Sequence, residues 1–181
     1  MRNELKNTAY HEAGHALIYY LLGRNIIFIN ANEDGTGICK VNPSFKPRYY
    51  TSNSLDEHEA EMLEWGMICL SGYASEIKMM GKKHDIRGLF EDFYLEEEEE
   101  PESDSECLIY EMEEINKIIG KKHFDIEFII KAWDKTNEII NKPDAWDAII
   151  MLSNKILDSE NNFLWGPEVE EIFNKYDKLH L

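Results

Sequence analysis

Basic residues and long apolar runs are scarce in this sequence, and each shortage narrows the classes of protein to which it can belong. Only 19 lysines and arginines stand against 36 aspartates and glutamates, which gives a formal net charge of −17. A chain with this charge repels the phosphates of nucleic acids and of anionic membranes, so neither is expected as a partner. No apolar stretch is long enough to span a bilayer, so membrane insertion is not expected either.

Cysteines are also few, and several common motifs are missing. Cys39, Cys69 and Cys107 are far apart, without the C-x-x-C spacing of zinc ribbons and redox motifs. The N-terminus lacks the basic start, apolar middle and cleavage site of a secretory signal. These features predict a cytoplasmic protein with reduced thiols, with a disulfide as the less favoured alternative. A G-x-x-x-x-G-K-[ST] phosphate loop is absent, which argues against nucleotide hydrolysis by this chain.

The pattern of apolar residues predicts a mainly helical fold. The length of 181 residues and the apolar share of 43% suit one domain spanning 1–181. A short hairpin is expected directly after the first helix, with strands near 26–29 and 37–41 joined by an Asp34-Gly35 turn. One of its edges could align an extended peptide, the alternative being a purely structural hairpin. Helices are predicted over 4–22, 54–80, 107–119, 125–141, 143–157 and 167–176, with a further amphipathic stretch from 85 to 93.

An acidic, proline-interrupted segment covers residues 96–106. It contains Glu96 to Glu100, Pro101, Glu102, Asp104 and Glu106. A run of like charges repels itself and stays solvated, so we expect a charged, solvated surface loop that is able to be disordered; a cation-binding or partner-binding tail is the alternative.

The residues with the clearest chemistry are His11-Glu12-Ala13-Gly14-His15, within the first predicted helix. Residues four apart lie on one helix face, so His11 and His15 can place two imidazole nitrogens on one metal ion. Zinc suits nitrogen and oxygen ligands, and catalytic zinc sites leave one position open for water, although another divalent metal could fill such a site. Glu12 can take a proton from that water and pass it to a leaving amine. The alternative is two surface histidines beside a glutamate.

A third protein ligand must come from elsewhere in the chain. No histidine follows His15 at the H-E-x-x-H-x-x-G-x-x-H spacing, which argues against a metzincin. Glu76, Asp85 and His84 are the candidates, although Asp85 could equally serve as a helix N-cap.

Three segments resemble the FtsH-type ATP-dependent zinc peptidases. The run from Thr8 to Leu17 resembles their active-site helix, and the run from Leu70 to Ile77 resembles their L-G-G-R-A-A-E-E helix. His84-Asp85-Ile86 stands where the family has an Asn-Asp-Leu segment that supplies the third zinc ligand, and residues 164–172 are similar to its closing L-D-G-x-E-V-x-x-I helix.

This resemblance implies a helical peptidase-like domain in which His11, His15 and Asp85 bind Zn²⁺ and Glu12 is the general base. Glu76 would then accept a hydrogen bond from a ligand imidazole. The segment between Glu76 and Asp85 is shorter than in the family, and the family's ATPase module is absent from the sequence.

The sequence therefore predicts a zinc metalloendopeptidase that acts on unfolded or flexible polypeptides, or on substrate delivered by a separate ATPase or adaptor protein. The alternatives are a non-catalytic interaction module or antagonist derived from such a domain, and a non-peptidase zinc hydrolase.

Overall fold

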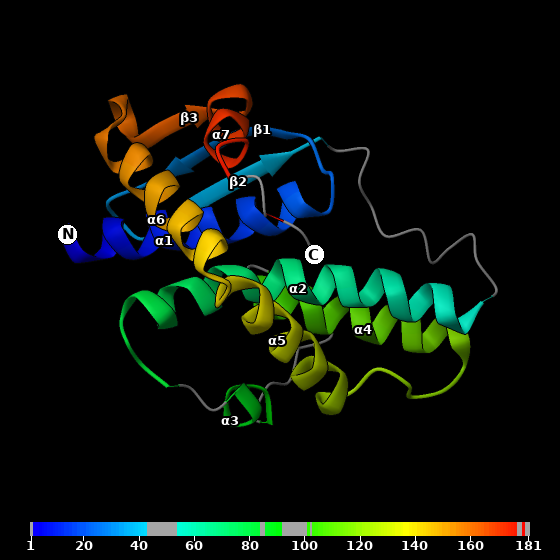
Figure 1. Ribbon diagram of the computed structural model, residues 1–181. Helices are drawn as coiled ribbons and strands as arrows, with labels where there is room; N and C mark the ends of the chain where they lie inside the picture. The colour runs from blue at the N-terminus through cyan, green and yellow to red at the C-terminus, as the bar shows by residue number, and fades with distance from the viewer. Residues whose placement is uncertain are drawn as a thin grey trace. The chain divides into compact units, whose positions relative to one another are not determined.

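The computed structural model describes residues 2–42, 54–83, 86–91, 101, 103–176 and 179. The predicted fold class is confirmed: the protein is mainly helical, with 71% of the described residues in helices, and a hairpin follows the first helix. The chain divides into two compact units, which are described separately below. In chain order the elements are α1 (Arg2–Leu21), β1 (Ile26–Ala31), β2 (Gly37–Val41), α2 (Leu55–Met79), α3 (Ile86–Glu91), α4 (Asp104–Ile119), α5 (Ile126–Ile140), α6 (Pro143–Asp158), the 3-10 helix η1 (Glu160–Asn162), β3 (Phe163–Trp165) and α7 (Gly166–Phe173) (Figure 1).

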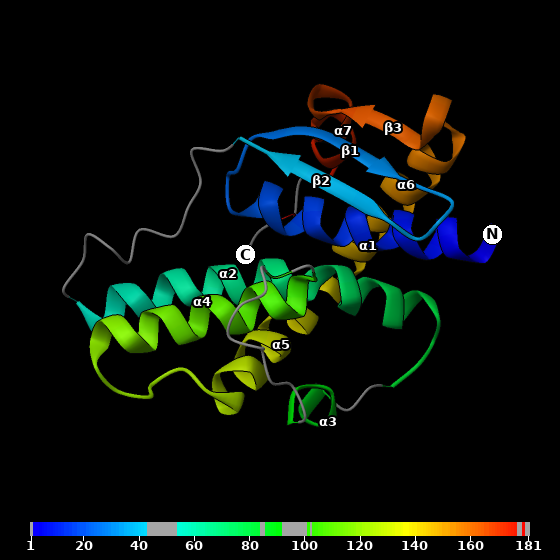
Figure 2. The ribbon, with the colours of Figure 1, turned by 180° about the vertical axis from the view of Figure 1, so that it is seen from behind.

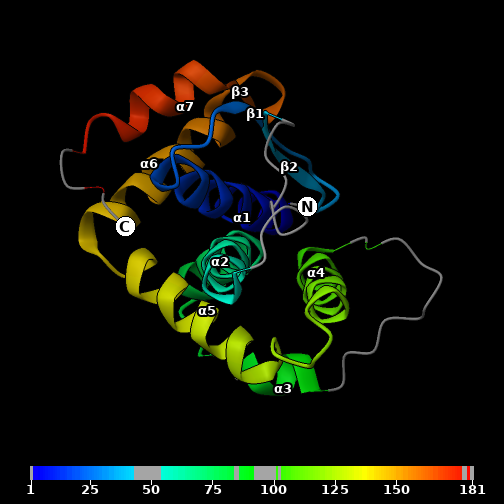
Figure 3. The ribbon, with the colours of Figure 1, turned by 90° about the vertical axis from the view of Figure 1, so that its right-hand side faces the viewer.

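The first unit contains residues 1–45, 71–83 and 137–181. Its sheet has the strand order β2-β1-β3, and both neighbouring pairs are antiparallel (Figure 2). Helix α1 contacts both the hairpin and α6, and α7 contacts β1 (Figure 3). The core between these elements is apolar and almost fully buried, and it includes Ala9, Leu17, Ile18, Ile29, Ile149, Leu152, Leu164, Val169 and Phe173.

Small residues on α1 allow the last two turns of α2 to approach it closely. Ala13 and Ala16 are fully buried, and a Cβ atom at Gly14 would overlap the Ser75 hydroxyl and the Ser71 carbonyl oxygen. Gly14, which has no side chain, therefore allows the two helices to pack closely at this point. This contact fixes the part of α2 that faces the histidine-containing turn of α1.

The third strand is an element that the sequence did not predict. Its three residues pair with β1, with Phe28, Ile29 and Asn30 opposite Trp165, Leu164 and Phe163. A strand of this length carries no readable alternation of apolar and polar residues. Its existence depends on pairing with a strand more than 130 positions earlier in the sequence.

The second unit contains residues 46–70 and 84–136, and its described part is entirely helical. Leu108, Met112, Ile115, Phe124, Phe128 and Ala132 form its core. Helix α4 starts at Asp104, inside the segment predicted to be an acidic loop. Ser103 and Glu106 cause this earlier start, because they form a capping box in which each side chain accepts a hydrogen bond from the other residue's main-chain N–H. Residues 96–100 and 102 of the predicted loop lie outside the described residues.

Among the described residues, no helix is long and apolar enough to cross a membrane.

Candidate metal centre

Helix α1 brings the two predicted histidine ligands together. The Nε2 atoms of His11 and His15 are 2.9 Å apart, and the two rings meet edge to face with centroids 4.6 Å apart. Each ring can offer one nitrogen to the same ion. His15 is buried with 6% of its surface exposed, whereas the His11 side chain is 24% exposed. His15 is therefore buried, while part of the His11 ring reaches the surface.

The other nitrogen of each imidazole is held by α2. His11 Nδ1 lies 2.6 Å from Glu76 Oε1, and His15 Nδ1 lies 3.2 Å from Ser71 Oγ. When each Nδ1 carries the proton, it donates to these oxygens, and each Nε2 then has a lone pair that can bind an ion. Oxygen acceptors behind ligand imidazoles commonly fix this tautomer and the orientation of the ring.

The convergence of the two Nε2 atoms favours a cation between them. When both Nδ1 atoms carry the protons, two Nε2 lone pairs at 2.9 Å repel each other and a cation between them removes that repulsion; an Nε2–H of one ring donating to the other ring is the metal-free alternative. Zinc–nitrogen bonds of about 2.0–2.1 Å at a tetrahedral angle require about 3.3 Å between the nitrogens, so rings would separate by only about 0.4 Å to accept the ion. The residues therefore fit a divalent metal ion.

Gly72 leaves the space beside the two nitrogens open. A Cβ atom at this position would lie 2.6 Å from His15 Nε2 and 2.5 Å from His11 Cδ2. Both distances are well inside van der Waals contact, so any larger residue would occupy the space next to the nitrogens or displace a ring. The observed arrangement of the two imidazoles therefore requires a residue without a side chain at position 72.

Glu12 points from the same turn of α1 toward the hairpin. Only 5% of its surface is exposed, and its carboxylate lies so close to β2 that a Cβ atom at Gly37 would be 2.5 Å from Oε1. Burial, and then the negative charge of Glu12, raise the pKa of the Cys39 thiol well above its usual value. This favours the protonated thiol of Cys39 at neutral pH.

Strand β2 presents an open edge next to Glu12. It is an outer strand of the sheet formed by the described residues. Asn32 N donates to Thr36 O at 2.8 Å, so this pair marks where main-chain groups of the two strands face each other. The pairs Asn30–Ile38 and Phe28–Lys40 follow at two-residue intervals and have the same orientation. Because main-chain groups alternate in direction along an antiparallel strand, those of Gly37 and Cys39 point away from β1.

The structure brings several of the predicted site residues together. His11 and His15 converge, Glu12 lies on the same turn of α1, and Glu76 contacts the His11 imidazole. Asp85 and His84 lie outside the described residues, so the assignment of Asp85 as third ligand stays a prediction.

Sequence reasoning missed the contributions of Ser71 and Gly72. A signal was present, since Ser71, Gly72, Ser75 and Glu76 recur at the spacing of one helix face. The pattern became interpretable only when that face was seen to lie against α1.

No protein-family model matches the chain, and no curated protein is detectably similar to it. The functional argument therefore rests on the geometry of the site.

Proposed function

We propose that this protein is a zinc-dependent metallopeptidase that hydrolyses peptide bonds of unfolded or flexible polypeptides. One observation carries the proposal: the two motif histidines converge through Nε2 while oxygens from α2 hold both Nδ1 atoms. Glu12, the residue expected to be the base, lies between this pair and an open strand edge. Two surface histidines without a shared role would not need this supporting set of contacts.

In the proposed site His11 and His15 bind zinc, and Asp85 is the third ligand. When bound, zinc polarises a peptide carbonyl and lowers the pKa of a water molecule to about 7. Glu76 and Ser71 hold the imidazoles in the orientation and tautomer that ligation requires.

Glu12 performs the proton transfers. Its carboxylate accepts a proton from the attacking water and donates it to the nitrogen of the departing amine, so that the base is regenerated in each cycle. A structural metal site has no need of such a base, which favours the peptidase over the non-catalytic interaction module.

The open edge of β2 is the proposed substrate track. An extended peptide can add to this edge as a further strand, paired with the main-chain groups of Gly37 and Cys39 and directly beside Glu12. Only a chain without its own folded structure can adopt this conformation. The substrate is therefore an unfolded or flexible polypeptide, or one delivered by a separate ATPase or adaptor.

The Glu12→Gln variant tests the proposal. With one zinc ion per chain, the wild-type protein should cleave a fluorescently labelled unfolded protein, and the variant should bind zinc equally while its rate falls about 10²- to 10⁴-fold. Glu4→Gln, a change in the first turn of the same helix, should alter neither property. Zinc-loaded wild-type protein that cleaves no faster than Glu12→Gln would disprove the peptidase assignment and leave the interaction module.

The third ligand is tested by zinc retention during dialysis. Asp85→Ala should lose zinc, and Glu76→Ala should weaken binding without abolishing it. Full retention of zinc by Asp85→Ala would overturn the assignment of Asp85.

A further inference from the structure

The strand register places six side chains on the face of the sheet opposite the core. Phe28 has Lys40 and Trp165 as its cross-strand neighbours, and Asn30 has Ile38 and Phe163. The alternate residues Ile29 and Leu164 are at most 1% exposed and form the core side. We call the two rows Lys40–Phe28–Trp165 and Ile38–Asn30–Phe163 the outer face.

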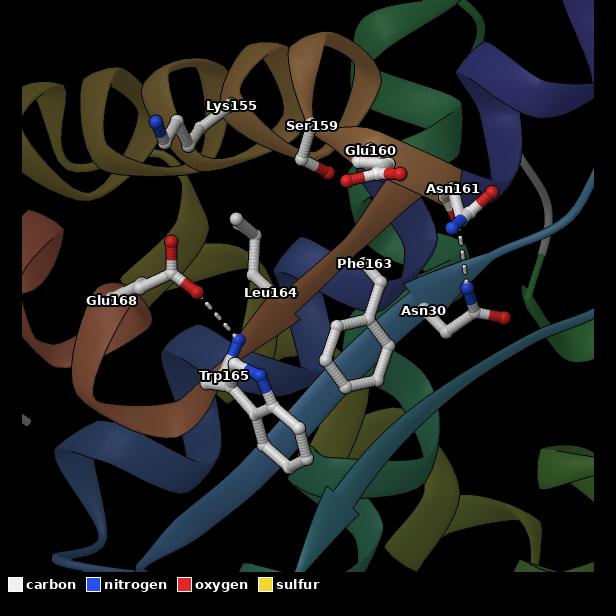
Figure 4. A pocket seen from close by; sticks show the side chains of 9 residues that line it. All are labelled: Asn30, Lys155, Ser159, Glu160, Asn161, Phe163, Leu164, Trp165 and Glu168. Carbon is white, nitrogen blue, oxygen red and sulfur yellow. Dashed lines mark hydrogen bonds between the residues drawn. The ribbon is translucent and has the colours of Figure 1, made fainter.

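The outer face exposes aromatic surface. Trp165 is 58% exposed and Ile38 is 42% exposed. The Phe28 and Phe163 rings stack with centroids 5.3 Å apart, and the Phe163 and Trp165 rings meet edge to face at 4.8 Å. Figure 4 shows the Phe163 and Trp165 rings on the same side of the sheet as Asn30. Adjacent exposed aromatic rings of this kind are typical of interaction surfaces.

A hydrogen bond at Trp165 blocks the edge of β3 but leaves the outer face accessible to a partner. The main-chain N–H of Trp165 donates to Glu168 Oε2 at 2.9 Å, which occupies a donor that an added strand would need (Figure 4). An additional strand is therefore disfavoured at β3, while the indole of Trp165 stays accessible.

The charge of the outer face indicates what kind of chain it binds. None of the residues in the three strands is acidic, and Lys40 is their one charged residue. The whole chain, by contrast, carries a net charge of −17, so a second copy would be repelled at any face-to-face contact. An apolar, neutral or weakly basic polypeptide segment would not be repelled.

We propose that the outer face binds an aromatic or large apolar side chain of the polypeptide substrate, at a distance from the bond that is cleaved. This inference rests on the proposed peptidase function and defines its substrate class. A substrate strand on the β2 edge lies about three strand spacings of 4.8 Å, or about 14 Å, from β3. An extended chain rises about 3.4 Å per residue. The anchoring side chain therefore lies roughly three to five residues along the substrate from the cleaved bond, which lies at the β2 edge.

A pocket beside β3 completes the anchor site. Its volume is about 600 Å³. One wall is formed by three residues of the outer face, Asn30, Phe163 and Trp165 (Figure 4). Lys155, Ser159 and Glu168 contribute polar groups to the rest of the lining. An apolar side chain can stack on the rings while these polar groups bind the adjacent peptide main chain.

The experiment uses the full protein and a set of peptides that share one cleavable segment. In one series, each peptide carries a single tryptophan placed two to eight residues from the cleaved bond. A control peptide has the same cleavable segment and no tryptophan. For peptides with tryptophan three to five residues away, Trp165→Ala should raise KM about 10-fold and change kcat less than 2-fold. Trp165→Phe should restore most of the affinity, and Ile118→Ala, which removes an exposed side chain from α4, should have no effect.

A binding measurement separates this inference from the proposed function. The Kd of the same peptides for the Glu12→Gln protein should rise about 10-fold when Trp165→Ala is added, even if no peptide is hydrolysed. An unchanged Kd, or an equal change for the peptide without tryptophan, would overturn the inference. It would also be overturned if sedimentation showed a wild-type dimer that Trp165→Ala converts to a monomer with unchanged peptide affinity, because the face would then bind a second copy.

Discussion

Gly72→Ala is the sharpest test of the metal centre, because the structure gives the consequence of a single methyl group. The added Cβ atom would lie 2.5 Å from His11 Cδ2 and 2.6 Å from His15 Nε2. Ordinary contacts need about 3.4–4 Å, so at least one ring must move by about 1 Å. Metal–ligand distances tolerate only about 0.2 Å. We therefore expect zinc affinity to fall on the order of 100-fold or more.

Thermal unfolding with and without zinc measures this loss. Zinc binding adds to the free energy of unfolding. At a zinc concentration that saturates the wild-type protein, a 100-fold weaker Kd lowers this contribution by about 2.7 kcal/mol. For a chain of this size, that corresponds to a zinc-induced rise in Tm smaller by about 5–11 °C. In the metal-free protein, a gain of about 1 kcal/mol in helix propensity offsets part of the overlap, which costs about 1–3 kcal/mol, so Gly72→Ala should lose at most about 2 kcal/mol of stability before zinc is added.

Gly66→Ala is the matched control for this experiment. It lies on the same helix, and its added Cβ atom would be 2.8 Å from Ala132 Cβ in the second unit, so it combines the same propensity gain with a similar overlap. It should change the stability of the metal-free protein without changing the zinc-induced rise in Tm. If Gly72→Ala keeps the full wild-type rise, the reasoning about the metal centre is refuted.

Two further results are expected. Glu76→Gln should weaken zinc binding about 10- to 100-fold in a competition assay with a chromophoric chelator, because it removes the carboxylate that contacts His11. Glu59→Gln, which alters a histidine–glutamate contact in the second unit, should leave zinc affinity unchanged, and equal effects of the two changes would contradict this role for Glu76. Stability should also fall above about pH 9, because burial raises the pKa of the Cys69 thiol and the unfolded chain then binds fewer protons than the folded chain. Because the Cys39 and Cys107 thiols also have raised pKa values, denaturant titrations at pH 7–10 should show a loss of stability in both proteins. The loss per pH unit should be smaller in Cys69→Ala than in wild type by up to about 1.4 kcal/mol, and equal slopes would refute this role of Cys69.

Local interactions made much of the helical part predictable. α1, α2, α5 and α6 fall within a few residues of the predicted ranges, because apolar periodicity and Pro143 at the start of α6 act over neighbouring residues. The hairpin was predictable for the same reason, since the Asp34-Gly35 turn joins two adjacent strands. The start of α4 was predicted too late because its charged first turn resembles a loop until the Ser103 capping box is recognised.

The sequence by itself determined the histidine pair and its neighbouring glutamate. His11 and His15 are four residues apart on a helix, and that spacing alone brings the two imidazoles together. Only the tertiary structure decided which groups support the pair. Ser71, Gly72 and Glu76 reach the histidines from more than 55 positions away, through a close approach of two helices that depends on the small residues at their contact. The outer face was likewise decided by tertiary structure, because β3 joins the sheet through pairing between strands that are distant in the sequence.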